Sequence, residues 1–185
     1  TAILAPLFIV MSLLYGVVVY YLLLVIINKL HKTIIESEVI ENLKKLTVMF
    51  LFANLYFLFL YHLTNMYISK HLEFEIFILF NGGVYTAAFW LGQVLIGIIL
   101  PLIFLLTNRM CSYFSLLISS VFVLFGSFMS MFVIIIAGQA YPLTIFPDHT
   151  IVESSFYDNV IHSYVPSIYE LGLGIGGIAL ALIIV

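Results

Sequence analysis

Four polar side chains lie inside the apolar segment 46–69 at a spacing that could support chemistry. Asn54, Tyr61 and Asn65 follow one another at intervals of seven and four residues, and His62 lies beside them. These intervals place side chains on one face of an α-helix. Polar groups are costly in lipid unless they face protein, water or a ligand. We therefore expect this stripe to face the interior of a helix bundle, where interhelical hydrogen bonds alone would also explain it.

The histidines and the cysteine argue against a metal cofactor bound by this chain. His62 is the only histidine well inside an apolar run, because the others lie in connections (His31, His71, His149 and His162). A b-type haem commonly takes two axial histidines from facing helices. The single Cys111 excludes an intrinsic cysteine-ligated iron–sulfur cluster and an internal disulfide. We expect no haem, no cluster and no other metal site.

Glu170 is the one formal charge within the five long apolar runs of the chain. It follows Pro166 by four residues, which places it in the first turn of a helix. The helix dipole stabilises a carboxylate there by roughly 0.3–1 kcal/mol. Glu170 is thus either a helix-start residue or a proton-handling carboxylate at the membrane boundary.

The composition identifies the elements that must position these residues as membrane helices. Hydrophobic residues make up 64% of the chain and charged residues 8%, and the mean hydropathy is +1.25. Five stretches, uncharged except for Glu170, are long enough to cross a hydrocarbon layer of roughly 30 Å as helices. They are 2–27, 46–69, 76–108, 110–137 and 166–185. None shows the alternation of a barrel strand, so we expect an all-α integral membrane protein with five transmembrane helices.

The two ends of the chain predict that it is part of a longer protein. The chain begins at Thr1 within apolar sequence and stops at Val185 within the last apolar run. We therefore expect a single transmembrane domain, 1–185, that forms about half of a larger helical bundle.

The charges of the connections predict the orientation. Five of the six Lys and Arg residues lie between the first and second runs or between the third and fourth (Lys29, Lys32, Lys44, Lys45 and Arg109). By the positive-inside rule these connections are cytoplasmic, and the loops after 46–69 and 110–137 are outside. The second of these loops, 141–165, has no Lys or Arg and is long for a bundle connection. We expect this loop either to dock a partner or to cover the outer helix ends. Exposure to solvent alone would also explain why its charged residues are acidic.

Four segments in matching order resemble the polysulfide reductase NrfD-type membrane subunits. They read "APLFIVMSLLYG", "FWLGQVLIGIILPLIFLL", "IIAGQAYP" and "YVPSIYELGLGIG". They are similar to the carboxyl-terminal half of that family. The resemblance implies a multi-pass subunit in a prokaryotic plasma membrane that exchanges electrons between a quinone pool, menaquinone or ubiquinone, and an iron–sulfur, ferredoxin-like partner. It also implies a further catalytic or cytochrome subunit, and it raises the possibility of proton translocation.

The resemblance and the topology together select candidate residues at the outer helix ends. Gln139 and Tyr141 offer an amide and a phenol just before Pro142 ends the helix. With His162 and Tyr164 they are candidates for contact with the quinone headgroup or the partner, and Glu170 is a candidate proton relay. A secondary transporter and a purely structural anchor remain alternatives, although no inverted repeat is visible.

Overall fold

The computed structural model describes residues 2–31, 36–107, 112–141 and 165–184. The regular structure of these described residues is entirely helical, and no strand occurs among them. The chain divides into two compact units, Thr1–Ala137 and Gly138–Val185. The all-α prediction is confirmed.

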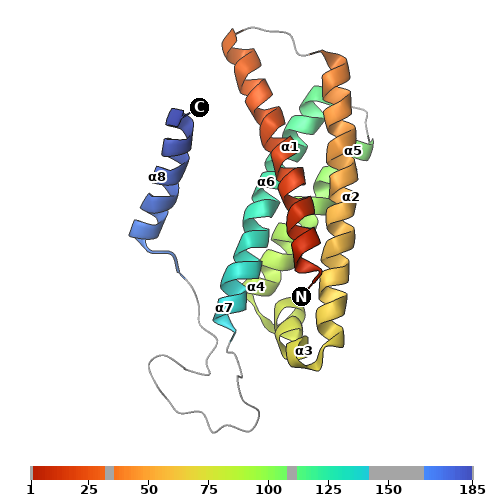
Figure 1. The fold of residues 1–185 in the computed structure, drawn as a ribbon, viewed down its shortest axis with the longest axis vertical. Coiled ribbons are helices and arrows are strands. Elements are labelled where there is room, and N and C mark those ends of the chain that lie inside the picture. Colours follow the sequence, from red (N-terminus) through yellow and green to blue (C-terminus); the bar gives the residue numbers. More distant parts are fainter. Residues whose placement is uncertain (1, 32–35, 108–111, 142–164, 185) are drawn as a thin grey trace. The chain divides into compact units, whose positions relative to one another are not determined.

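The first unit contains six α-helices and three π-helical segments in its described part (Figure 1). In chain order they are α1 (Leu4–His31), α2 (Ser37–Tyr67), α3 (Ser69–Ile76), η1 (Phe77–Asn81), α4 (Val84–Ala87), η2 (Ala88–Ile99), α5 (Leu100–Thr107), α6 (Ser112–Met131) and η3 (Phe132–Ala137). The second unit contains α7 (Gly138–Ala140) and α8 (Ile168–Ile184).

Four of the described helical segments are long and apolar enough to cross a membrane. They are Leu4–His31, Ser37–Tyr67, Val84–Thr107 and Tyr113–Ala140. Each corresponds to one of the first four runs expected from the sequence. The fifth expected run, 166–185, is represented by α8, whose apolar part Ile168–Leu180 is shorter. The protein is therefore a multi-pass membrane protein.

Helix α1 shows why these apolar segments form a bundle. Its buried side chains recur every three or four residues (Leu7, Met11, Leu14, Val18 and Tyr21). This spacing is that of one helix face, and α1 packs with it against α2 and α6. The Tyr21 hydroxyl donates a hydrogen bond of 2.8 Å to the carbonyl oxygen of Tyr113 at the start of α6. Other apolar side chains of α1 are exposed, among them Ile9, Leu13 and Val19, as expected of a helix that spans a membrane.

Two glycines allow η2 and α6 to approach until their backbones touch. A β-carbon added at Gly97 would lie 2.7 Å from the Cα of Gly126, which is closer than such atoms come in proteins. Small residues at helix crossings commonly permit this approach within membranes. The contact holds η2, which carries Gln93, close to α6.

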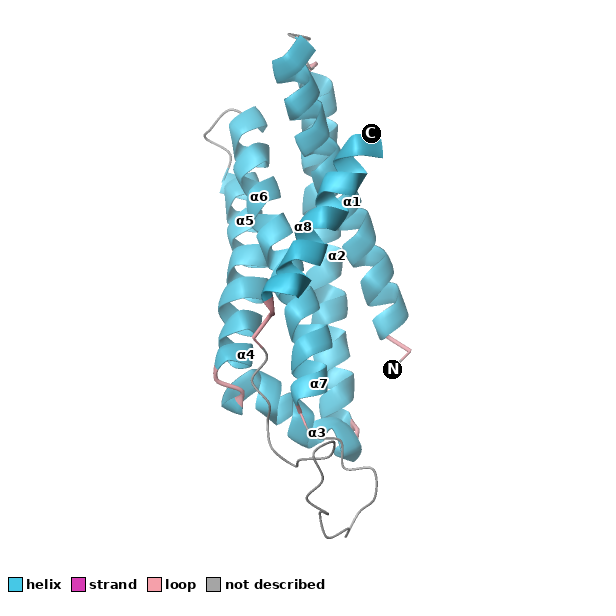
Figure 2. Cartoon of the chain, turned by 90° about the vertical axis from the view of Figure 1, so that its left-hand side faces the viewer, coloured by secondary structure: helices cyan, strands magenta, loops and turns pink. Residues whose placement is uncertain are grey.

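The segment between α2 and α4 departs from the expected uninterrupted run 76–108. The chain turns at Ile68, forms α3 and η1 at the end of the bundle, and turns again at Gly82 and Gly83 before α4 (Figure 1, Figure 2). Gly83 has a φ of 55°, a conformation that side chains other than glycine rarely adopt. The membrane-crossing part of this run therefore begins at Val84 rather than at residue 76.

Side-chain hydrogen bonds hold this segment against the helix that follows it. The Gly82 amide donates to Thr86 Oγ1 over 2.9 Å, and Thr86 Oγ1 donates to the Phe77 carbonyl over 3.2 Å. The indole of Trp90 donates to the Leu79 carbonyl over 3.0 Å. These bonds place α3 where its side chains meet the end of α2.

Candidate functional site

A buried carboxylate and an imidazole form an ion pair where α3 meets α2. Glu75, near the end of α3, is 0% exposed. Its Oε2 lies 2.7 Å from Nδ1 of His62, which α2 supplies 13 residues earlier. This is an ion pair when the imidazole is protonated and a neutral hydrogen-bonded pair when the proton lies on the carboxyl group. The two groups can therefore share one proton.

Asn65 completes the set of partners around the carboxylate. Its Nδ2 donates a hydrogen bond of 2.8 Å to Glu75 Oε1. Asn65 lies three residues after His62, so one face of α2 presents both side chains to α3. A buried carboxylate is strongly destabilising unless it is paired and hydrogen-bonded. Here each of its oxygen atoms has a partner.

Aromatic rings enclose the imidazole. The ring centres of His62 and Phe89 lie 4.7 Å apart in an edge-to-face arrangement, and those of His62 and Tyr61 lie 5.2 Å apart. Edge-to-face contacts fix the orientation of a ring as well as burying it. The pair is therefore held rigidly in surroundings of low polarity, in which its electrostatic interactions are strengthened.

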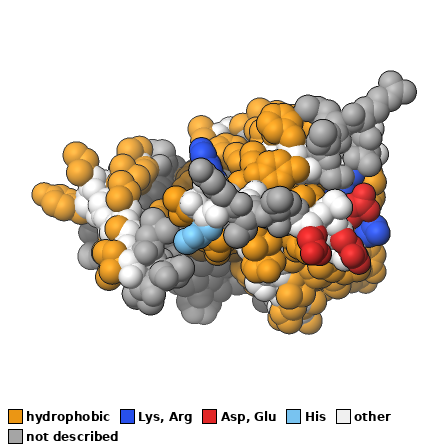
Figure 3. Space-filling view, turned by 90° about the horizontal axis from the view of Figure 1, so that it is seen from above, with side chains coloured by type: hydrophobic (Ala, Val, Ile, Leu, Met, Phe, Trp, Pro, Cys, Tyr) orange, Lys and Arg blue, Asp and Glu red, His pale blue; other side chains and the backbone are white. Residues whose placement is uncertain are grey.

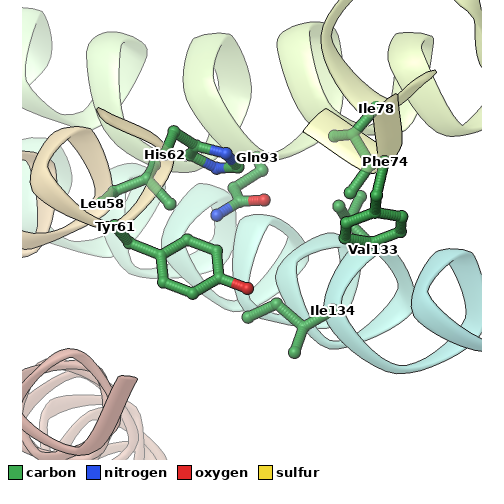
Figure 4. Close-up of a pocket in the computed structure, with 8 residues that line it drawn as sticks. All are labelled: Leu58, Tyr61, His62, Phe74, Ile78, Gln93, Val133 and Ile134. Carbon is green, nitrogen blue, oxygen red and sulfur yellow. The ribbon is translucent and has the colours of Figure 1, made fainter. Parts of the chain in front are cut away.

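A small cavity of about 20 Å³ adjoins the imidazole. Its walls come from α2, α3, η1, η2 and η3, and Figure 4 shows the Gln93 amide beside the His62 ring. The cavity is lined by Leu58, Tyr61, His62, Phe74, Ile78, Gln93, Val133 and Ile134. Gln93 is only 3% exposed, and its Oε1 has no hydrogen-bond partner within the described residues.

Comparison with known proteins identifies the family of this bundle. A family model described as polysulphide reductase, NrfD, matches residues 1–142. The chain belongs to the NrfD family. No curated protein and no solved structure gave a match. The family comprises membrane subunits of quinone-linked oxidoreductase complexes, and the matched residues include the whole His62–Glu75 cluster.

The cavity in this NrfD chain does not fit the quinone that its family implies. Pockets that hold small organic ligands commonly measure about 300–1,000 Å³. The space beside His62 and Gln93, at about 20 Å³, admits no quinone ring. The hydrogen-bonded imidazole and carboxyl group beside this cavity can exchange a proton.

An open groove near the beginning of α2 is larger but has a different character. It measures about 390 Å³ and is lined by Glu41, Lys44, Lys45, Val48, Met49, Leu105 and Leu106. Viewed from above, acidic and basic side chains lie side by side at this end of the protein (Figure 3). Ionic groups at the mouth of an open groove favour water and ions over an uncharged ring. We derive no quinone site from this groove.

The polar stripe expected on 46–69 lies on α2. Asn54 and Asn65 are buried, whereas Tyr61 and His62 are half-buried. The structure brings His62 and Asn65 together on Glu75, and it places Tyr61 and His62 on the cavity. Asn54 lies about two turns earlier.

No group of three or more His, Cys, Asp or Glu side chains able to hold a metal occurs in the described part of this NrfD chain.

The candidates at the outer helix ends belong to the second unit. Gln139 is exposed and Tyr141 is half-buried, whereas His162 and Tyr164 lie outside the described residues. The Ser167 amide donates to Glu170 Oε2 over 2.7 Å, and the Glu170 amide donates to Ser167 Oγ over 3.3 Å. This reciprocal pair is a capping box, which stabilises the first turn of a helix. The geometry of Glu170 thus matches the helix-start interpretation of this residue.

Glu75 is the functional candidate that the sequence interpretation missed. Glu75 lies in the connection between the apolar runs 46–69 and 76–108, one residue before the second run begins. The sequence feature that could have revealed it is a carboxylate with an apolar residue on each side, Phe74 and Ile76. Only the return of α3 toward α2 shows that this acid is buried beside a histidine.

Proposed function

We propose that this NrfD chain is the quinone-interacting membrane subunit of a respiratory oxidoreductase complex and that its His62–Glu75 pair transfers protons. In this proposal the chain exchanges electrons between a menaquinone or ubiquinone pool and an iron–sulfur partner subunit. A further catalytic or cytochrome subunit completes the complex. The family match supports the redox role, and the buried pair is the observation that supports proton transfer.

The acid–base pair suits this role for a general chemical reason. Quinone reduction consumes protons as well as electrons, so a quinone-linked subunit needs groups that carry protons within an apolar bundle. An imidazole hydrogen-bonded to a carboxylate can accept a proton on one atom and release one from another. Glu75 Oε2 shares a hydrogen bond with His62 Nδ1, and Asn65 donates a hydrogen bond to the other carboxyl oxygen.

We also propose an orientation. The positive-inside rule places the connection after 46–69, which contains Glu75, on the outer side of the prokaryotic plasma membrane. The same rule assigns the connection after 110–137 to that side. Gln139 and Tyr141, with His162 and Tyr164, are then available on the outer side for contact with the quinone headgroup or the iron–sulfur partner.

The conservative variant Glu75→Gln tests the proton role in the full-length chain assembled with its partners. Glutamine keeps the shape of the side chain but cannot gain or lose a proton near neutral pH. General acid–base groups commonly contribute roughly 10²–10⁴-fold to rate, so quinol-linked turnover per assembled complex should fall by about tenfold or more. Glu73→Gln is the matched control, because Glu73 is an exposed carboxylate on the same helix. Equal turnover in the two variants would refute a proton role for Glu75.

A further inference from the structure

Gln93 presents an unsatisfied polar atom to a cavity that already contains an acid–base group. The side chain is 3% exposed, and no donor among the described residues reaches its Oε1. Buried polar side-chain atoms nearly always have a hydrogen-bond partner, from protein or from ordered water. A water molecule in the cavity that Gln93 lines can supply such a partner.

The cavity has the size and the lining that one water molecule requires. A cavity needs roughly 10–15 Å³ to admit a water molecule, and this one measures about 20 Å³. An internal water typically makes about three hydrogen bonds. The cavity offers three polar side chains, those of Gln93, His62 and Tyr61, and its other lining residues are apolar (Leu58, Phe74, Ile78, Val133 and Ile134).

His62 has a ring nitrogen suited to this water. Its Nδ1 is engaged by Glu75 Oε2 at 2.7 Å, which leaves Nε2 as the second hydrogen-bonding atom of the imidazole. His62 and Gln93 lie next to each other on the cavity wall (Figure 4). A water molecule there can donate to Gln93 Oε1 and hydrogen-bond to the imidazole.

We infer that the cavity between Gln93 and His62 is an internal water site and that its water passes protons to the His62–Glu75 pair. This inference rests on the proton-transfer role proposed above. A proton delivered to the water as hydronium moves to His62 Nε2, while the proton on Nδ1 moves to Glu75 Oε2. The products are a neutral water, a neutral imidazole with its proton on Nε2, and a protonated Glu75. Return of the protons along the same atoms resets the site.

Gln93 acts in this scheme as a positioning residue. Its amide carries no charge near neutral pH and accepts a hydrogen bond from the water without taking its proton. This bond directs the oxygen of the water toward His62. An apolar side chain at position 93 would leave the water with fewer partners than an internal water normally has.

Gln93→Leu tests the water site without any need for quinone turnover. Leucine fills much of the same space as glutamine but has no hydrogen-bonding side-chain atom. The full-length chain, assembled with its partners, is irradiated in ¹⁸O-labelled water so that hydroxyl radicals formed from internal water oxidise adjacent side chains. Tyr61 and Phe74 line the cavity, and we expect Gln93→Leu to lower their labelling several-fold. Gln139→Leu is the matched control, since Gln139 is exposed and lies in the other unit.

Two results would overturn the water site. The first is labelling of Tyr61 and Phe74 that is the same in the wild type and in Gln93→Leu. The second is a high-resolution density map of the complex with no ordered water between Gln93 Oε1 and His62. Loss of labelling in Gln93→Leu but not in Gln139→Leu supports the inference.

Quinol-linked turnover separates failure of this inference from failure of the proposed function. If the water carries protons, turnover per assembled complex should fall by about tenfold in Gln93→Leu as well as in Glu75→Gln. A fall in Glu75→Gln alone would overturn the role of the water and leave the proposed function intact. Unchanged turnover in Glu75→Gln, with the labelling difference present, would refute the proton-transfer part of the proposed function and leave only a structural water.

Discussion

Glu75 on α3 and Glu170 at the start of α8 are carboxylates with opposite surroundings. Glu75 is completely buried and shares its hydrogen bonds with His62 and Asn65 from another helix. Glu170 is exposed, and it exchanges two hydrogen bonds with Ser167, three residues away. A proton leaving Glu75 has an imidazole beside it, whereas the bonds between Glu170 and Ser167 are those that start a helix. The partner groups, and not the carboxylate, determine which chemistry is available.

The largest expected effect is the loss of stability in Glu75→Ala. This change leaves His62 and Asn65 without their shared partner in a buried site. Breaking a buried ion pair by removing one member commonly costs about 3–5 kcal/mol. Equilibrium unfolding of the full-length chain in detergent micelles measures this loss, with Glu73→Ala as the control. A loss below about 1 kcal/mol would mean that the site is hydrated like a surface site.

Asn65→Leu should have a smaller effect at the same place. It removes the donor to Glu75 Oε1 but leaves the bond between Glu75 Oε2 and His62. Hydrogen bonds to charged groups contribute roughly 1.5–3 kcal/mol, and the same unfolding experiment should show a loss of that size. Combining Asn65→Leu with Glu75→Gln gives a double-mutant cycle, in which contacting residues are non-additive. Additive losses would show that Asn65 stabilises the bundle without acting through Glu75.

The sequence predicted the membrane spans well, because hydropathy and span length are local properties. The first four apolar runs each correspond to a helical segment long enough to cross a membrane. The break before Val84 was not predicted. It depends on one backbone angle at Gly83 and on hydrogen bonds from Thr86 and Trp90, and glycine pairs are also frequent within uninterrupted membrane helices.

The candidate site was predictable only in the part that lies on one helix. The spacing of Tyr61, His62 and Asn65 follows from helical periodicity alone. Glu75 and Gln93 join them through the packing of α3 and η2, which no local pattern contains. The sequence draws attention to Glu170, because that acid lies inside an apolar run, whereas burial of Glu75 requires its neighbouring segment to fold back.

Ser167→Ala should have a moderate and local effect. It removes the hydroxyl that accepts a hydrogen bond from the Glu170 amide. Loss of a serine at the start of a helix typically costs about 1 kcal/mol. Hydrogen exchange of the backbone amides of residues 168–171 should become about fivefold faster, while exchange in α2 and α3 should not change. Equal acceleration in α2 would contradict a purely local cap.

Glu170→Gln should have the smallest effect and gives the sharpest contrast with Glu75→Gln. Glutamine also serves at this position of a capping box, so the bond from the Ser167 amide can persist. Only the interaction of the charge with the helix dipole is lost, roughly 0.3–1 kcal/mol.

If Glu170 only starts the helix, turnover per assembled complex stays near the wild-type value while Glu75→Gln loses about tenfold. If Glu170 relays protons, turnover in Glu170→Gln falls as far as that in Glu75→Gln although the helix is intact. Equal losses in the two variants would therefore mean that the exposed carboxylate and the buried one serve the same proton route, and that the hydrogen bonds to Ser167 do not limit what Glu170 does.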